Sequence, residues 1–317
     1  MPRGKEKVSS ENNKKDTQEE ELWERISTTT GAERAKVLDE LSHIAYRKDN
    51  YTECLQLIDT SIDIYDELGR DLYTRELIHL YEGKAFCLSN LNQSAEAAET
   101  FELIASLYAS NDDNDGFLRA TRASAREWYE AGEWEKSLNG HSLAQGFIDP
   151  DITAYSMGID TLNISMAMQK LGRHEEAVVN LLKAREIFKD DKNPEYVNWC
   201  DQYLAESYIA LGNGMEALFH ATHYYNYSNV IESLDMEPYA RYRLGQSHRL
   251  LREYEQAQHH FKRALELITL DDRKDWETII KLNNELAAVL FAQGKDDQAQ
   301  KILNRISTIE ETMGLVD

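Results

Sequence analysis

Proline, glycine and cysteine are all scarce in this sequence. It contains 4 Pro and 15 Gly among 317 residues, about half their usual combined share. So few chain breakers exclude a collagen-like chain and argue against a β-sandwich or a disordered chain. Cys54, Cys87 and Cys200 are an odd number without a CxxC motif, which excludes a disulfide framework and fits three core thiols in a reducing compartment.

Long apolar runs and positive charge are missing as well. No run approaches the ~18 apolar residues of a membrane span, and the charged start at residues 1–7 lacks the apolar segment of a secretory signal. The 35 Lys and Arg face 57 Asp and Glu, for a net charge of −22. Such a field repels phosphate backbones and anionic lipids. We therefore expect a cytoplasmic protein with neither nucleic-acid nor membrane partners, and find no sign of its oligomeric state.

A short pattern recurs along the chain. It is clearest at residues 171–177 (LGRHEEA) and 211–217 (LGNGMEA). Seven turn residues mark its copies, with steps of 43, 40, 40, 40, 40 and 42 residues: Asp49, Asn92, Gly132, Gly172, Gly212, Arg252 and Gly294. This regularity predicts seven copies of one structural unit.

Two columns of small residues flank the turn residues. Seven positions before them stand Ser42, Ala85, Ala125, Ser165, Ala205, Gly245 and Ala287; five positions after them stand Cys54, Ala97, Ser137, Ala177, Ala217, Ala257 and Ala299. Small residues let two helices cross closely, and Gly, Asp and Asn tolerate the positive φ at which helices often end. Each copy therefore predicts two antiparallel helices joined at its turn residue.

These residues resemble the tetratricopeptide (TPR) repeat, most closely from Leu244 and Gly245 through Tyr254 and Ala257 to Phe261 and Ala264. The period of about 40 residues is similar to kinesin light chain and to Rap-type peptide-sensing regulators, while the usual first-helix Trp is missing in most copies and the closing Pro is absent. The resemblance implies an all-α, right-handed α-solenoid of about seven helix pairs. We expect a disordered charged tail at 1–19, a capping helix at 20–31 with Leu22, Trp23 and Ile26 on one face, and one superhelical domain at 32–317.

Two segments resemble parts of metal-binding motifs. Residues 111–116 resemble the start of a calcium loop, but Arg122 stands where an EF-hand needs its Glu. His220 and His223 could share a helical face, yet the neighbouring tyrosines and the absence of HExxH favour a packed aromatic helix. P-loop, dinucleotide-glycine and GxSxG motifs are absent. We expect no enzymatic activity, no cofactor and no metal.

The resemblance implies that the first helix of each pair faces a concave groove. Residues thirteen, ten, six and three positions before each turn residue, here named the first-helix stripe, would line it. Repeat 3 places Arg119, Arg122 and Arg126 there, and arginine forks suit carboxylates. The predicted partner-binding residues are Arg119, Arg122, Arg126, Tyr129, Met166, Trp199, Tyr239, Tyr242, Arg249, and the amides Asn163 and Asn284.

Two interpretations of these residues remain open. Either the arginines hold an acidic segment or a C-terminal carboxylate beside the apolar stretch, or they pair with Glu82, Glu127 and Glu130 and only offset charge. Leu162 and Met166 could likewise be inter-repeat core. The sequence predicts a non-enzymatic scaffold or adaptor that captures a protein or peptide segment. The alternative is a Rap-type regulator whose peptide ligand reshapes the superhelix; the roughly thirty residues before repeat 1 are too few for the N-terminal bundle of those proteins, which argues against direct control of transcription.

Overall fold

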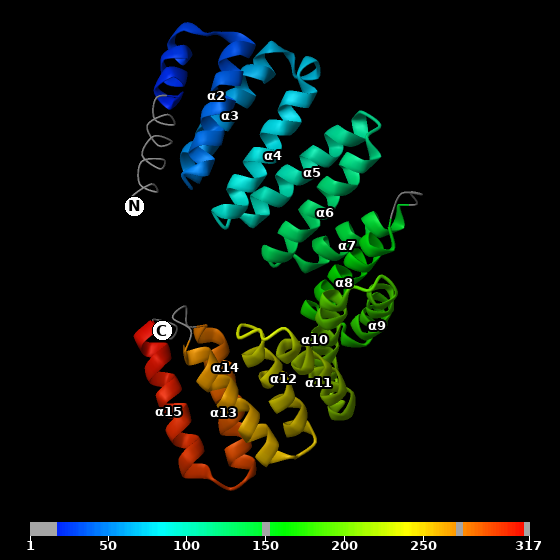
Figure 1. The fold of residues 1–317 in the computed structure, drawn as a ribbon. Helices are drawn as coiled ribbons and strands as arrows, with labels where there is room; N and C mark the ends of the chain where they lie inside the picture. Colours follow the sequence, from blue (N-terminus) through cyan, green and yellow to red (C-terminus); the bar gives the residue numbers. More distant parts are fainter. Residues whose placement is uncertain (1–17, 148–152, 271–274, 314–317) are drawn as a thin grey trace, which may run out of the picture. The chain divides into compact units, whose positions relative to one another are not determined.

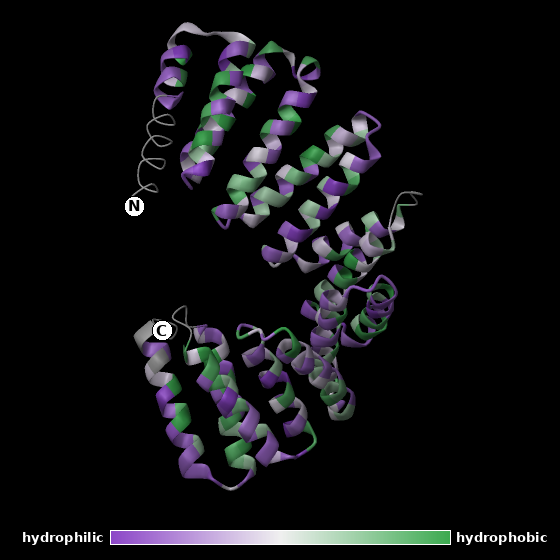
Figure 2. Cartoon of the chain, in the orientation of Figure 1, coloured by the Kyte–Doolittle hydropathy of each residue, from purple (hydrophilic) through white to green (hydrophobic). Residues whose placement is uncertain are grey.

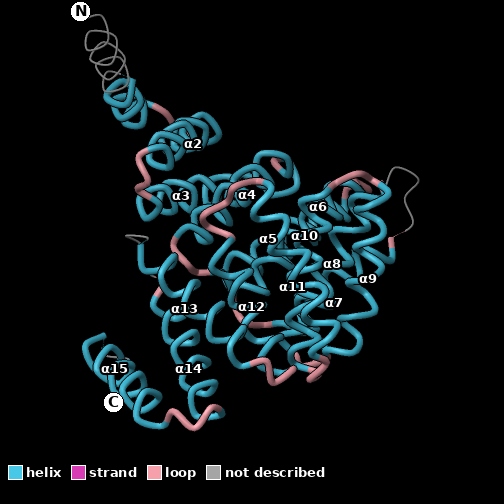
Figure 3. The backbone as a smooth tube through the Cα atoms, turned by 60° about the horizontal axis from the view of Figure 1, so that its bottom comes forward, coloured by secondary structure: helices cyan, strands magenta, loops and turns pink. Residues whose placement is uncertain are grey.

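The computed structural model describes residues 18–147, 153–270 and 275–313. Its regular elements within these ranges are all helical, as Figure 3 shows. The chain divides into two compact units, Met1–Phe147 and Ile148–Asp317. Within each unit, successive helices pack against one another as antiparallel pairs. The predicted all-α repeat solenoid is confirmed.

The first unit begins with a helix at residues 18–28 and continues through three helix pairs. Figure 1 shows them in blue to green. The helices are α2 (Gly31–Arg47), α3 (Tyr51–Gly69), α4 (Thr74–Asn90), α5 (Ser94–Ser110), α6 (Asn114–Glu130) and α7 (Trp134–Gly146), with a short 3₁₀ helix, η1 (Arg70–Leu72), between α3 and α4.

The second unit consists of four helix pairs, green to red in Figure 1. They are α8 (Ala154–Lys170), α9 (His174–Asp190), α10 (Pro194–Ala210), α11 (Gly214–Val230), α12 (Glu237–Leu250), α13 (Tyr254–Leu270), α14 (Trp276–Ala292) and α15 (Asp296–Met313). Hydrophobic and hydrophilic residues alternate along most of these helices (Figure 2), as expected where one side of a helix is buried.

All seven predicted turn residues have a positive φ, including Arg252 at 61° and Asp49 at 57°. The residue after each turn residue donates its N–H to a carbonyl five positions back, as Arg173 does to Met168 at 2.9 Å. This bond caps the first helix of the pair. The turns between repeats use the same geometry at Asp112, Lys192 and Glu232, which the sequence did not indicate because none of these residues is glycine.

The two columns of small residues are buried throughout. A Cβ added to Gly245 would lie 2.5 Å from the ring of Phe261, which is itself fully buried. One added to Gly140 would lie 2.7 Å from the Cβ of Ala125. The predicted close crossing of the paired helices is therefore confirmed.

The start of the first unit differs in part from expectation. Leu22 is buried and Ile26 packs against the core, but Trp23 is 45% exposed because it lies on another side of its helix. Of the expected tail, residues 1–17 lie outside the described residues, and residues 18 and 19 are helical. The sequence also predicts an inter-repeat loop at 271–274, and those residues lie outside the described part of the chain as well.

The thiols of Cys54 and Cys87 meet in the core of the first unit, with their sulfur atoms 3.0 Å apart. They belong to neighbouring repeats, 33 residues apart in the sequence. Because the two cysteines are far apart in the sequence, their contact could not be predicted from it. Both cysteines are free and buried.

A buried ionic network joins three helices of the second unit. Asp201 on α10, only 2% exposed, accepts hydrogen bonds from Arg185 of α9 at 2.9 and 3.2 Å. Its Oδ1 also lies 2.6 Å from Nδ1 of His220 on α11. The ring of His220 stacks on Tyr208, whereas His223 is exposed. The two histidines thus have different environments, and His220 lies in the aromatic packing expected for this helix.

Candidate partner-binding surface

Most of the first-helix stripe is exposed or half-buried. Large side chains on it reach solvent, including Phe86 at 50%, Trp199 at 41% and Phe291 at 42% exposed. Leu162 and Gln246 are buried exceptions. Leu162 belongs to a hydrophobic cluster of α8, α9 and α10, and Met166 packs against the same cluster. The interpretation of Leu162 as inter-repeat core therefore holds.

The predicted partner-binding residues are divided between the two units. Arg119, Arg122, Arg126 and Tyr129 lie on α6 of the first unit; the other seven lie on α8, α10, α12 and α14 of the second. Their role in binding remains a prediction.

In the first unit, Arg119 lines an open pocket of about 630 Å³ together with His79, Glu82 and Tyr108. Its Nε lies 3.5 Å from a carboxylate oxygen of Asp115, and its guanidinium lies 5.9 Å from the centre of the Tyr108 ring. The hydroxyl of Tyr108 donates to Glu82 at 3.2 Å. Burial and the nearby carboxylate raise the pKa of Tyr108.

The charge of this pocket argues against an acidic ligand in it. Its lining residues include four carboxylates and only two arginines: Asp71, Glu76, Glu82, Asp113, Arg75 and Arg119. Arg119 pairs with Asp115 rather than with the glutamates expected from the sequence. Arg126 is exposed on the same helix.

In the second unit, stripe residues of repeats 6 and 7 line an open pocket of about 340 Å³. Its lining residues are Tyr242, Arg249, Lys281, Asn284, Glu285 and Ala288. Five of these six are stripe residues, all but Glu285. Two first helices therefore converge on one pocket through positions selected from the repeat spacing alone.

Polar contacts hold this second pocket in shape. Arg249 Nε lies 2.7 Å from one carboxylate oxygen of Glu285, and Gln246 donates to the other at 2.9 Å. Burial raises the pKa of Tyr242 to about 12, so its hydroxyl remains protonated at neutral pH. The pocket offers an arginine, a lysine, an amide and a phenol to a ligand.

Tyr239 and Trp199 lie elsewhere on the second unit's stripe. Tyr239 donates to Asp275 at 3.0 Å and lines a pocket of about 720 Å³ with Pro238, Leu267 and other residues. The Trp199 ring lies 5.6 Å from that of Tyr196. These aromatic side chains extend the stripe beyond the pocket formed by repeats 6 and 7.

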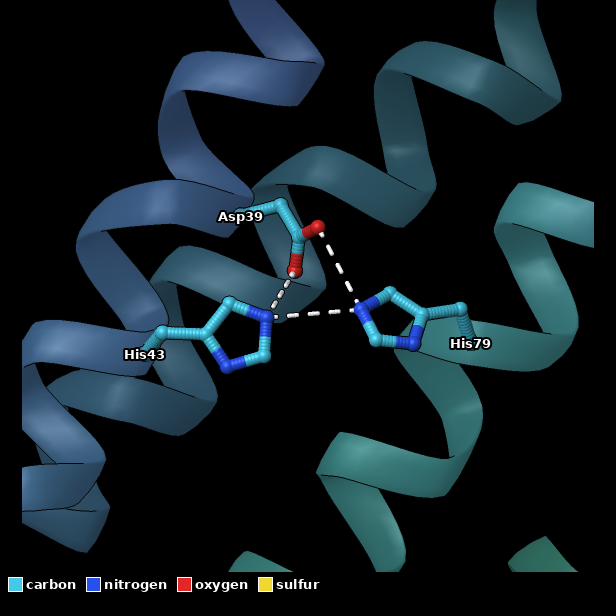
Figure 4. Close-up of side chains that lie close together, drawn as sticks. All are labelled: Asp39, His43 and His79. Atoms are coloured by element: carbon cyan, nitrogen blue, oxygen red, sulfur yellow. Dashed lines mark hydrogen bonds and ion pairs between the residues drawn. The ribbon is translucent and has the colours of Figure 1, made fainter.

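One group that the sequence did not indicate is formed by Asp39, His43 and His79 (Figure 4). Each residue offers one ligand atom, and these atoms lie within 4.8 Å of one another. The hydrogen bond to Asp39 raises the pKa of His79. All three belong to the first-helix stripe. Their proximity could have been predicted only by placing the stripe of repeat 1 beside that of repeat 2.

Comparisons with known proteins place the fold in the class of solenoids built from repeated helix pairs. No curated protein sequence matches the chain. Residues 237–311, from the start of α12 to two residues before the end of α15, match the tetratricopeptide repeat family. Together with the structural matches, this confirms the resemblance to the TPR superfamily.

Three solved structures illustrate that fold. The apo form of RapI matches with a TM-score of 0.65 at 11% identity, over 89% of this chain and 99% of RapI. A STAND protein with a tetratricopeptide repeat sensor from Pyrococcus horikoshii matches at 0.67 and 15%, over 88% of this chain and 42% of that protein. Nearly identical TPR-like repeats of a putative kinesin light chain from Podosopora anserina match at 0.51 and 16%, over 62% and 96%. At these identities the likeness establishes the fold alone.

The part of the chain that the structure describes contains no helix long and apolar enough to cross a membrane.

Proposed function

We propose that the protein is a non-enzymatic, cytoplasmic scaffold that binds a protein or peptide segment along its first-helix stripe. One observation carries the proposal: five of the six residues lining the pocket of repeats 6 and 7 are stripe residues. The TPR fold supports partners of this kind. The net charge of −22 supports proteins or peptides over nucleic acids and membranes.

The chemistry of this pocket favours a carboxylate ligand. Arg249 and Lys281 supply positive charge, Asn284 supplies an amide donor, and Tyr242 supplies a protonated hydroxyl. Glu285 offsets part of this charge through its ion pair with Arg249. A C-terminal carboxylate is small enough for the pocket and can accept hydrogen bonds from several donors at once.

A second candidate function is that of a Rap-type regulator whose peptide ligand reshapes the superhelix. The match to nearly the full length of RapI favours it. It shares the binding surface of the first proposal and adds a change of shape. Small-angle scattering with and without a bound peptide separates the two, because a regulator of this type should compact and a rigid scaffold should not.

The double variant Arg249→Glu/Lys281→Glu should weaken peptide binding about tenfold or more, since hydrogen bonds to charged groups contribute about 1.5–3 kcal/mol. The measurement uses a library of fluorescent hexapeptides with free C-termini, each beside its amidated form. Arg263→Glu/Lys262→Glu on α13 is the control with the same change in charge. A peptide affinity that changes neither in the variant nor on amidation of the C-terminus would contradict a carboxylate site in this pocket.

A further inference from the structure

We propose that Asp39, His43 and His79 form a transition-metal site, suited first to Zn²⁺, that ties α2 to α4. Asp39 and His43 are one helical turn apart on α2, and His79 projects from α4 toward them (Figure 4). A bound ion would therefore link the first helices of repeats 1 and 2. The proposal does not depend on the function proposed above.

The nitrogen and oxygen atoms of the three side chains are spaced closely enough to surround a tetrahedral ion. Nε2 of His43 lies 3.3 Å from Nε2 of His79. Oδ1 of Asp39 lies 3.6 Å from Nε2 of His43, and Oδ2 of the same carboxylate lies 3.5 Å from Nε2 of His79. Zinc bonds of about 2.0–2.1 Å at tetrahedral angles separate ligand atoms by about 3.3–3.4 Å. The two imidazole nitrogens already have the spacing that a tetrahedral ion requires, and a turn of the Asp39 carboxylate would bring one of its oxygens toward both of them.

The donor set matches zinc in chemistry as well. Two imidazole nitrogens and one carboxylate are typical of sites that leave a coordination position open. The side chains of His43 and His79 are 56% and 54% exposed, so an ion can reach them from solvent. Because all three residues belong to the stripe, the open position can take a water molecule or a side chain of a bound partner.

The test is a titration of the full chain with Zn²⁺ by calorimetry and with Co²⁺ by visible absorption. We expect one equivalent to bind, a tetrahedral Co²⁺ spectrum, and a higher melting temperature with zinc. His43→Gln and His79→Gln should each weaken binding by about tenfold or more, because loss of even an outer-shell partner costs about 10–100-fold. The control His259→Gln changes an exposed histidine of the second unit and should bind normally.

Two results would overturn the metal site. One is the absence of saturable binding below about 100 µM Zn²⁺, because weaker binding would correspond to a free energy too small for a specific site. The other is a bound equivalent that His43→Gln and His79→Gln leave unchanged. Both substituted side chains are exposed, so circular dichroism should show that the variants fold as the parent does.

A different observation points to a second site, on the other unit. Asn198 of α10 is only 3% exposed, and neither its Nδ2 nor its Oδ1 has a hydrogen-bond partner in the described part of the chain. A buried amide without partners costs free energy. Asn198 lines a pocket of about 340 Å³ between α9, α10 and α11. A ligand that reaches the Asn198 amide from this pocket would satisfy both its donor and its acceptor.

The lining of this pocket defines the ligand. Lys189 and Lys192 place positive charge at it, Pro194 and Val197 are apolar, and Tyr227 is aromatic. Asp201 also lines it, but Arg185 and His220 already engage its carboxylate. We infer a compact ligand with an anionic group and a planar edge that carries one donor and one acceptor. A nucleoside monophosphate and the C-terminal residue of an acylated peptide both have this chemistry.

Substitution of Asn198 separates binding from stability. Asn198→Leu removes an unpartnered buried amide at similar volume, so the ligand-free melting temperature should stay equal or rise. The probes are AMP and N-acetyl-leucine, with adenosine and N-acetyl-leucine amide as the forms that lack the anion. We expect one anionic probe to raise the melting temperature of the parent chain and not that of Asn198→Leu.

The response to AMP or to N-acetyl-leucine distinguishes the two sources of the ligand. A comparison of Lys192→Gln with Lys183→Gln tests whether the positive charge at the pocket contributes to binding. Lys183 lies exposed on α9 and outside the pocket lining, so only Lys192→Gln should weaken binding. Destabilisation by Asn198→Leu, or no response to either anionic probe at millimolar concentration, would overturn this site.

Discussion

Gly245→Leu should lower the stability of the second unit sharply. A Cβ at this position would lie 2.5, 2.6 and 2.9 Å from ring atoms of Phe261, and Phe261 is fully buried. The ring has no exposed space into which to move, so helices α12 and α13 must separate. Overpacking of this kind costs about 1–3 kcal/mol and occasionally more.

Thermal unfolding measures the effect, which should lower the melting temperature by about 5 °C or more. Gly146→Leu is the matched control, because a Cβ at Gly146 would meet no atom of the described residues within 4 Å. Equal melting of the Gly245→Leu variant and the parent would show that α12 and α13 do not depend on a small residue at their crossing.

Asp201→Asn should be the most destabilising polar substitution tested. It removes the closer and more buried of the two carboxylates that compensate Arg185, whose side chain is only 17% exposed, and it weakens the bond to His220. Removing one member of a buried ion pair costs about 3–5 kcal/mol, because the other charge remains buried without compensation. Chemical denaturation of the variant measures this loss.

The double variant Arg185→Met/Asp201→Leu should recover part of that stability, since apolar residues of similar size often replace a buried ion pair at little cost. The control Arg173→Ala breaks an exposed pair with Glu176 at 2.7 Å at the N-terminus of α9 and should change little. Equal stability of Asp201→Asn and the parent would contradict the role assigned to this network.

The repeat architecture could be predicted from the sequence because each repeat applies the same local physics. A residue with positive φ must end the first helix, and small residues must stand where the two helices cross. Spacing alone therefore identified Gly172 as a turn and Ala177 as buried. Even Arg252, an unfavourable residue for such a turn, could be placed by its neighbours.

Features that depend on packing between repeats could not be predicted in this way. Leu162 and Gln246 occupy stripe positions, yet neighbouring helices cover them. The Asp39–His79 group and the Cys54–Cys87 contact join different repeats, so neither forms a motif in sequence. The structure also divides into two compact units after Phe147, where no change in composition marks a boundary. One domain over 32–317 remains a prediction.

The most direct test of the central claim is to map the bound partner by photo-crosslinking. A photoreactive phenylalanine analogue replaces Trp199, Tyr242 or Phe291 on the stripe of the second unit. In matched variants it replaces Val179, Leu182 or Met215, which are exposed on the second helices α9 and α11. If the stripe binds the partner, a captured protein or peptide should crosslink from the first set and not from the second. Crosslinks confined to α9 and α11 would contradict the account.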